Sequence, residues 1–304
     1  MNKVGFFYDD VFLKHEPTGF HTENRERLVA IVEVLQNSAV WSNLIHISPR
    51  EASFKDISLI HAERYIEKVK SLESGYLDAD TYVSKGSLDA ARYAVGAVIE
   101  AVERCMKGEI KRAFCAVRPP GHHAESSAAM GFCIFNNIAI GARYAQKIGY
   151  KKVFIIDFDV HHGNGTQHAF EEDDTVYFFS THQYPHYPGT GRDAERGKGR
   201  GEGFTYNVPM KSGSGDREYL DVYQKTLPPL MKTFAPDLVL VSAGYDILSD
   251  DPLSSIHVSH EGIRLIMRAI LQSASVPVVI SLEGGYHLRA LSEAVRITLE
   301  EMLK

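Results

Sequence analysis

The chain has 304 residues, of which 44% are hydrophobic and 24% charged, a composition typical of a folded globular protein. Its formal net charge of -6 argues against a general nucleic-acid-binding surface, which needs clustered lysine and arginine. Three cysteines without a C-x-x-C pair argue against a disulfide framework, and no segment has the ~20 consecutive apolar residues of a membrane span. We therefore expect a single cytoplasmic domain over residues 1–304 without nucleic-acid or membrane partners, and the oligomeric state stays open.

Apolar runs that resemble strands alternate along the chain with segments of helical periodicity. The strand-like runs are Val4–Tyr8, Ala113–Val117, Val153–Asp159, Thr175–Ser180, Phe204–Val208, Leu238–Ser242 and Val276–Leu282. The helix-like segments are Leu88–Cys105, Asn137–Lys147, Glu218–Phe234, Glu261–Leu271 and Leu291–Leu303. This alternation predicts an α/β fold with a mostly parallel sheet and helices on both faces. Ligands of such sheets bind beyond the carboxyl ends of the strands.

The first chemical cluster, RPPGHH at residues 118–123, follows the run Ala113–Val117. Adjacent histidines usually point apart, but proline and glycine interrupt a regular strand, so both rings can enter one pocket. His123 is our candidate general base. Taken alone, a pair of histidines is better explained by core packing or by chance at the surface.

The most informative segment is DFDVHHGNG at residues 157–165, after the apolar residues Val153–Ile156. In an extended strand Asp157, Asp159 and His161 would point to one side. Burying unpaired carboxylates costs several kcal/mol, so these groups should bind a cation or each other. Two aspartates alone would also fit a structural role in capping the glycine-containing segment. Asp157 is placed to hold His122, and Asn164 is a plausible partner for His123.

Asp159, His161 and Asp246 are the predicted ligands of a divalent metal. Asp246 follows the strand-like run Leu238–Ser242, and alone it would fit a turn residue equally well. Two carboxylates and one imidazole leave positions open for water and substrate, as a catalytic site requires. The set does not select zinc uniquely, because iron(II), cobalt or manganese can also occupy it.

Aromatic residues beside glycines are candidates for the remaining parts of a site. Tyr286 follows two glycines, and its hydroxyl is placed to donate to a developing oxyanion, although an isolated Gly-Gly-Tyr is more often a turn. Phe132, next to Gly131, and Tyr187 suit the walls of a narrow channel, although aromatic residues are more often part of the core.

Six motifs together resemble the histone deacetylase and acetylpolyamine amidohydrolase superfamily in order and spacing. They are RPPGHHA (118–124), GFC (131–133), DFDVHHGNGTQ (157–167), YPGTG (187–191), AGYD (243–246) and EGGY (283–286). The resemblance extends over nearly the whole chain. It implies an arginase/deacetylase-like α/β fold of about eight strands and a zinc-dependent hydrolase that removes acyl groups from amines.

The resemblance also implies roles for individual residues. Metal ligation falls to Asp159, His161 and Asp246, acid–base work to His122 and His123, and carbonyl polarisation to Tyr286. A structural potassium ion is implied near the aspartate strand, and the matching positions are Asp157, Asp159, His161, Ser180 and Thr181. Asn164 stands where some relatives have aspartate, which places the chain nearer the class II branch and its bacterial-type deacylases.

Two departures from the family pattern concern the substrate. The usual amino-terminal HPE appears as HTE at residues 21–23, so the resemblance does not carry a substrate-loop role to Arg27. Members that prefer acetylated polyamines tend to have an acidic residue where this chain has Leu253. That favours an acylated lysine in a protein or peptide, with Asp80 as a contact at the rim for the substrate backbone.

Two other functions remain open. A deacetylase of acetylpolyamines or other small acylated amines is the alternative within the enzymes. A metal-stabilised module that binds acylated ligands without turnover is the alternative from another class, and the intact Tyr286 argues against it. Nucleotide binding is less favoured, because no G-x-G-x-x-G follows the first strand-like run.

Overall fold

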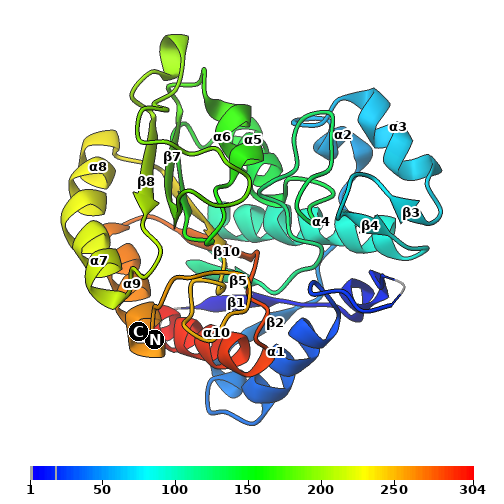
Figure 1. Cartoon of the computed structure of the whole chain (residues 1–304), viewed down its shortest axis with the longest axis horizontal. Coiled ribbons are helices and arrows are strands. Elements are labelled where there is room, and N and C mark those ends of the chain that lie inside the picture. The colour runs from blue at the N-terminus through cyan, green and yellow to red at the C-terminus, as the bar shows by residue number, and fades with distance from the viewer. Residues whose placement is uncertain (1–2, 18) are drawn as a thin grey trace.

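A parallel sheet is the centre of the protein, seen in a computed structural model that describes residues 3–17 and 19–304. Within these residues eight strands follow the order β2-β1-β5-β10-β9-β6-β7-β8 (Figure 1). They are β1 (Val4–Phe7), β2 (Ile45–Ile47), β5 (Arg112–Cys115), β6 (Val153–Asp157), β7 (Val176–Gln183), β8 (Thr205–Met210), β9 (Leu238–Ala243) and β10 (Val278–Leu282). A separate antiparallel pair is formed by β3 (Gly75–Tyr76) and β4 (Tyr82–Val83).

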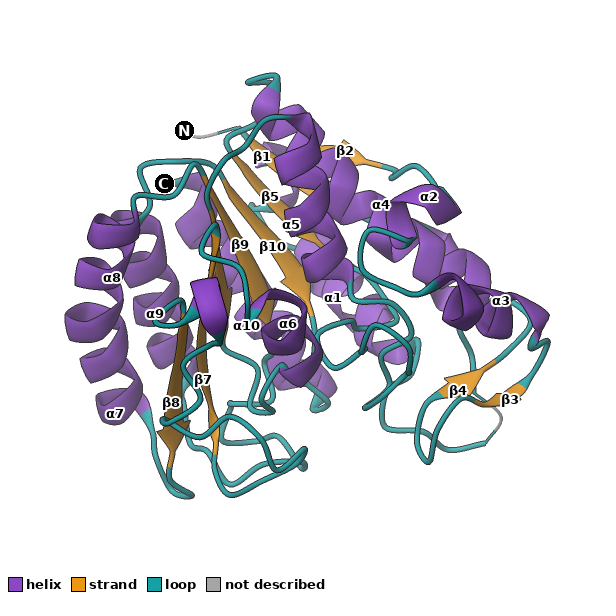
Figure 2. Cartoon of the chain, turned by 90° about the horizontal axis from the view of Figure 1, so that it is seen from above, coloured by secondary structure: helices purple, strands orange, loops and turns teal. Residues whose placement is uncertain are grey.

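Helices cover both faces of this sheet (Figures 1 and 2). The α-helices are α1 (Glu26–Gln36), α2 (Phe54–Ile57), α3 (Glu63–Ser71), α4 (Ser87–Met106), α5 (Asn137–Ile148), α6 (Asn164–Phe170), α7 (Asp216–Asp221), α8 (Leu227–Phe234), α9 (His260–Ser273) and α10 (Leu288–Leu303). Helices α1, α10, α9 and α8 pack in a row. Helices α4 and α5 pack against each other and against strands of the central sheet. The expected α/β architecture with a parallel central sheet is therefore confirmed.

The strands form where the sequence is apolar on both faces. Every residue of β6, β7, β9 and β10 is buried, as expected for strands covered by helices on each side. The strand β2 was not predicted, because it has three residues and two of them are exposed. The expected helix over Glu218–Phe234 is present as one uninterrupted helical segment in which a π-helical stretch at Val222–Thr226 joins α7 to α8.

One expectation about β6 was wrong. The predicted strand ran to Asp159, but β6 ends at Asp157, so Asp159 and His161 lie beyond the sheet. The carboxylate of Asp157 accepts a hydrogen bond from the backbone N–H of Asp159 at 3.1 Å, and that of Asp159 accepts one from His161 at 2.9 Å. Such local bonds turn the backbone out of the strand, in competition with the ladder.

The carboxyl ends of five neighbouring strands position the site. Strands β5, β10, β9, β6 and β7 are adjacent and parallel, so the loops that follow them emerge at one edge. Figure 2 shows long loops gathered at the edge toward which the arrowheads of β9 and β10 point. This is the edge at which ligands of parallel α/β sheets bind.

Candidate active site

The three predicted metal ligands meet at this edge although the chain separates them widely. Donor atoms of Asp159, His161 and Asp246 all lie within 4.8 Å of one another, and all three residues are buried. The Nδ1 atom of His161 lies 3.1 Å from Asp159 Oδ1 and 3.2 Å from Asp246 Oδ2. Apart from this contact with His161, Asp246 Oδ2 has no hydrogen-bond partner among the residues that the structure describes. A buried carboxylate oxygen with so few partners is costly, and a cation would satisfy it.

Glycines let the backbone pass close to these carboxylates. A Cβ atom at Gly284 would lie 2.1 Å from Asp246 Oδ2, and one at Gly244 would lie 2.1 Å from Asp159 Oδ2. The backbone N–H of Gly284 donates to Asp159 Oδ2 at 2.8 Å, and that of Val160 donates to Asp246 Oδ1 at 2.9 Å. Backbone N–H groups therefore orient both oxygens of Asp159 and one oxygen of Asp246, which leaves Asp246 Oδ2 directed into the cluster.

Both histidines of the adjacent pair enter the same pocket. The centroids of the His122 and His123 rings are 4.0 Å apart. His122 Nδ1 lies 3.0 Å from Asp157 Oδ2, and His123 Nδ1 lies 2.8 Å from Asn164 Oδ1. One ring thus has a charged partner and the other a neutral amide, and the Nε2 atom of each ring is directed away from that partner.

These different partners move the two pKa values apart. Burial favours the neutral ring of His122, but the carboxylates of Asp157 and Asp159 outweigh it and raise its pKa to about 10. Burial and the charges of His122 and His161 lower the pKa of His123 well below its usual value. His122 is therefore held protonated and His123 neutral, so His123 is the ring that can accept a proton at neutral pH.

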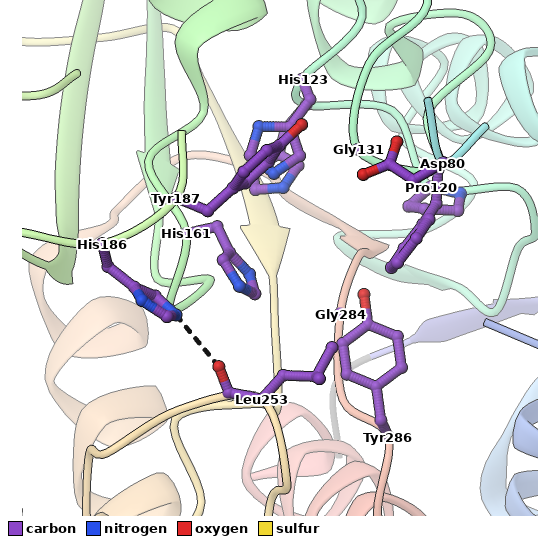
Figure 3. A pocket seen from close by; sticks show the side chains of 12 residues that line it. Asp80, Pro120, His123, Gly131, His161, His186, Tyr187, Leu253, Gly284 and Tyr286 are labelled. Carbon is purple, nitrogen blue, oxygen red and sulfur yellow. Dashed lines mark hydrogen bonds between the residues drawn. The ribbon is translucent and has the colours of Figure 1, made fainter. Parts of the chain in front are cut away.

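The pocket above this floor is narrow and mostly aromatic. It has a volume of about 230 Å³. The predicted site residues that line it are Asp80, His122, His123, Gly131, Phe132, His161, Tyr187, Leu253 and Tyr286. Figure 3 shows His123, His161 and Tyr187 across the pocket from Tyr286, whose hydroxyl points inward. Burial raises the pKa of Tyr286 well above 10, so the phenol stays protonated and able to donate.

The wall beside His123 depends on a close approach of the backbone. A Cβ atom at Gly131 would lie 2.5 Å from Cδ2 of His123, and the φ of +56° at Gly131 is one that other residues rarely adopt. The next residue, Phe132, has a φ of 69°, and its N–H donates to the Thr81 hydroxyl at 3.1 Å. Its ring is perpendicular to that of Tyr286, with centroids 6.1 Å apart.

Comparison with known proteins identifies the family. The histone deacetylase domain matches residues 21–302. A probable deacetylase of Archaeoglobus fulgidus is 37% identical over 93% of this chain and 81% of its own length. The crystal structure of the HDA15 HD domain superposes with a TM-score of 0.94 at 35% identity, covering 98% of this chain and 90% of that one. The chain belongs to the histone deacetylase family.

The resemblance implied an arginase/deacetylase-like fold, and the match to this structure confirms it. Histone deacetylase 18 of Arabidopsis thaliana is 38% identical over 98% of the chain, and the human polyamine deacetylase HDAC10 is 37% identical over 92%. The chain spans 48% and 44% of the lengths of these two relatives. None of its described helices is long and apolar enough to cross a membrane.

Three of the residues predicted to bind potassium lie on adjacent strands, whereas Asp159 and His161 follow the end of β6. Asp157 of β6 pairs in register with Ser180 of β7, and Thr181 follows it. The hydroxyl of Ser180 is 2.8 Å from His182 Nδ1, and that of Thr181 is 2.9 Å from the Tyr223 hydroxyl. A potassium site at these residues stays a prediction.

Sequence reasoning missed a buried ion-pair cluster that supports the site of this deacetylase family member. Glu23 is fully buried and pairs with Arg118 and Arg27. Arg27 also donates to the backbone carbonyls of Gly285 at 2.7 Å and Glu283 at 2.5 Å, next to Tyr286. These partners are up to 258 residues apart, so no local pattern reveals them.

Two further residues of the site also escaped the sequence analysis. Glu283 is fully buried and accepts hydrogen bonds from the N–H groups of Gly121 and His122 and from the Ser242 hydroxyl. His186 lines the pocket beside Leu253, and its Nε2 lies 3.0 Å from the Leu253 carbonyl oxygen (Figure 3). Glu283 opens the EGGY motif, so its presence beside Tyr286 was a usable signal.

Proposed function

We propose that the protein removes acetyl or other short acyl groups from the ε-amine of lysine side chains in proteins or peptides. The observation that carries the proposal is the arrangement of Asp159, His161 and Asp246 beneath one pocket that also holds His123 and Tyr286. Metal ligands, a candidate base and a hydrogen-bond donor for the carbonyl oxygen thus lie around one small pocket, which is what hydrolysis of an amide requires. Membership of the histone deacetylase family supports the same reaction class.

A divalent metal is part of this proposal. Members of this family are generally metal-dependent, and the residues present fit such an ion, because two carboxylates and one imidazole converge and Asp246 Oδ2 has no hydrogen-bond partner other than His161 within the described residues. Zinc is the ion we propose, although iron(II) or another divalent ion suits the same ligands. Bound there, it would supply a more acidic water and positive charge beside the substrate carbonyl.

The residues of the chain then have separate tasks. His123, neutral at its lowered pKa, accepts a proton from the attacking water through Nε2. Tyr286 donates its hydroxyl hydrogen bond to the carbonyl oxygen as negative charge develops there. A histidine of the pair then gives a proton to the leaving lysine amine. Asp157 and Asn164 hold the two rings in orientation.

The walls of the pocket suit the alkyl stem of lysine. Phe132, Tyr187 and Leu253 offer apolar surface, and each methylene gains roughly 0.8 kcal/mol on burial. Asp80 also lines the pocket, and it is the group we propose for contact with the substrate backbone.

Release of acetate from an acetyl-lysine peptide tests the proposal. We expect metal-dependent turnover that EDTA abolishes and added zinc restores. The substitution Tyr286→Phe removes the donor to the oxyanion and should lower kcat by roughly 10²- to 10³-fold. Unchanged turnover in Tyr286→Phe or His123→Ala would overturn the proposed mechanism.

A second candidate substrate class is that of acetylated polyamines and other small acylated amines. The similarity to the human polyamine deacetylase HDAC10 supports it, whereas the apolar Leu253 in the pocket wall provides no charge partner for a distant ammonium group. Parallel assays of acetylspermidine and an acetyl-lysine peptide separate the two classes, and the larger kcat/KM identifies the substrate type.

A further inference from the structure

Glu125 lies behind the candidate base, on the far side of Asn164. Its Oε1 accepts a hydrogen bond from Asn164 Nδ2 at 2.6 Å, while Asn164 Oδ1 is 2.8 Å from His123 Nδ1. The three side chains therefore form a line from the pocket to a carboxylate that has no place in the proposed reaction. His168, half-exposed on α6, completes the line at its outer end, with Nδ1 at 2.9 Å from the same Oε1.

The chemistry of these groups fixes the direction of each hydrogen bond. An ionised carboxylate only accepts, so it must face the NH₂ end of the amide of Asn164. The carbonyl end of that amide then faces His123 and also only accepts, so Nδ1 of His123 must carry the proton. A neutral imidazole has one N–H, which leaves Nε2 with its lone pair directed into the pocket.

Two further contacts keep Glu125 in place and ionised. The backbone N–H of Glu125 donates to Ala128 at 2.9 Å, and the ring of buried His61 bridges the Glu125 carbonyl and the Asn136 N–H, each at 2.9 Å. Burial would raise the pKa of Glu125, but hydrogen bonds from His168 and Asn164 lower it below its usual value.

We propose that Glu125 is a positioning residue that selects the base-competent tautomer of His123 by fixing the amide of Asn164. The inference rests on the proposed function, because it gives His123 the role of base. Asn164 Nδ2 also donates to the His123 carbonyl and to Met130 Sδ, but both contacts are longer, at 3.4 Å, than the 2.6 Å bond to Glu125. A neutral amide at position 125 can face Asn164 with either its donor or its acceptor, so the amide of Asn164 can then turn over and offer NH₂ to Nδ1, and the tautomer with a proton on Nε2 forms. That tautomer cannot accept a proton from water.

The first test is Glu125→Gln, a substitution that keeps the shape and removes the charge. We expect kcat on an acetyl-lysine peptide to fall roughly 10-fold, the lower end of effects seen when an orienting partner is lost, with KM unchanged. Glu172→Gln is the matched control, because Glu172 is an exposed glutamate just beyond the end of α6, and it should keep the wild-type kcat. An unchanged kcat in Glu125→Gln would overturn the inference.

The sign of the effect should reverse in the background Asn164→Asp. There the new carboxylate would face Glu125 across the 2.6 Å contact, so two negative charges repel where the wild type has a hydrogen bond. Adding Glu125→Gln supplies an NH₂ group to that position and should raise kcat above that of Asn164→Asp alone. A residue that only maintained packing would lower kcat in both backgrounds, and that outcome would also overturn the inference.

A direct measurement of the tautomer separates this inference from the proposed function. In ¹⁵N-histidine spectra of the zinc-loaded protein, assigned with His123→Gln, the wild type should show His123 protonated at Nδ1 and Glu125→Gln a mixture of tautomers. A single Nδ1–H form in both would refute the role of Glu125 even in an active enzyme. If no substrate is hydrolysed but the tautomers differ as expected, the proposed function fails and the positioning role stands.

Discussion

Gly131 is the residue at which the pocket wall and the candidate base come closest. Replacement by alanine would put a methyl group 2.5 Å from Cδ2 of His123 and strain a backbone with a φ of +56°. We expect Gly131→Ala to lower kcat at least tenfold, because a displacement of about 1 Å in a catalytic group can cost roughly 10²-fold. Steady-state kinetics on an acetyl-lysine peptide check this.

Gly108→Ala is the control for backbone strain at this scale. Gly108 has a φ of +70°, and no atom of the described residues lies within 4 Å of its added Cβ. It should lose stability of about 1 kcal/mol and keep its kcat. Equal losses of kcat in the two variants would show that general strain, and not the clash with His123, is responsible.

Leu253 is the residue at which we expect substrate choice to change. A carboxylate in the pocket wall would pair with the distant ammonium of a polyamine, so Leu253→Glu should raise the ratio of kcat/KM for acetylspermidine over acetyl-lysine peptide roughly tenfold, as for a partly desolvated pair. Leu253→Gln has the same shape without charge. If both substitutions change the ratio equally, charge is not the determinant.

At the residue scale, the sequence indicated more of the site than is usual because several motifs occur together. The motifs predict Asp159, His161 and Asp246 as ligands, and the structure brings their donor atoms together. The sequence does not predict a role for Glu125, because a glutamate near a histidine pair matches no motif with a defined chemistry. Its role depends on Asn164, which reaches it only after the chain has folded.

At the scale of elements, Glu23 joins the start of α1 to the loops after β5 and β10. It pairs with Arg118 and Arg27 in a fully buried cluster. Replacing it with glutamine leaves two buried cations with less compensation, so we expect Glu23→Gln to lower the free energy of unfolding by roughly 3–5 kcal/mol. Urea denaturation measures the difference.

The pH dependence of this difference has a definite sign. Burial would raise the pKa of Glu23, but Arg118 and His15 hold it well below the ordinary value of 4.5. The stability that the carboxylate contributes is then complete above that ordinary value and is lost as the pH falls through the lower folded pKa. The gap between wild type and Glu23→Gln should thus be full at about pH 7 and narrower near about pH 3. A gap that does not change with pH contradicts an ionised Glu23.

Elements that form because their residues are buried could be predicted from the sequence, whereas an element boundary set by side-chain hydrogen bonds could not. Composition predicts the buried strands β6, β9 and β10, because apolar and β-branched residues fill strands that are covered on both faces. It does not predict the end of β6, because alternation of Asp157, Asp159 and His161 looks the same in a strand and in a turn. Hydrogen bonds from backbone to carboxylate decided it.

For the molecule as a whole, metal removal should change stability as well as activity. A ligand that binds only the folded state at 100 times its Kd adds about 2.7 kcal/mol. We therefore expect EDTA to lower the melting temperature by several degrees, with recovery on adding zinc. Asp246→Asn should abolish this difference, whereas Asp250→Asn, an exposed neighbour, should keep it.

The difference in stability between zinc-loaded and EDTA-treated protein should grow with pH. Without metal, burial and the charge of Asp159 raise the pKa of Asp246 to about 7 from an ordinary 3.8. A raised folded pKa means that the metal-free protein is favoured at low pH and loses that stability as the pH rises toward 7. The gap between zinc-loaded and EDTA-treated protein should therefore be larger at about pH 8 than at about pH 5, since binding releases protons.

The fold divides the site between two kinds of support. Asp157 belongs to the sheet, and Asp159, His161 and Asp246 follow within a few residues of strand ends, whereas Phe132 and Leu253 lie further along the loops after β5 and β9, and Tyr187 lies on the loop between β7 and β8. Exchange of only the outer parts of these loops, beyond His123 and beyond Asp246, would alter which amides fit while the reacting groups keep their spacing. One chemistry can in this way be redirected to new acyl donors by remodelling the entrance alone.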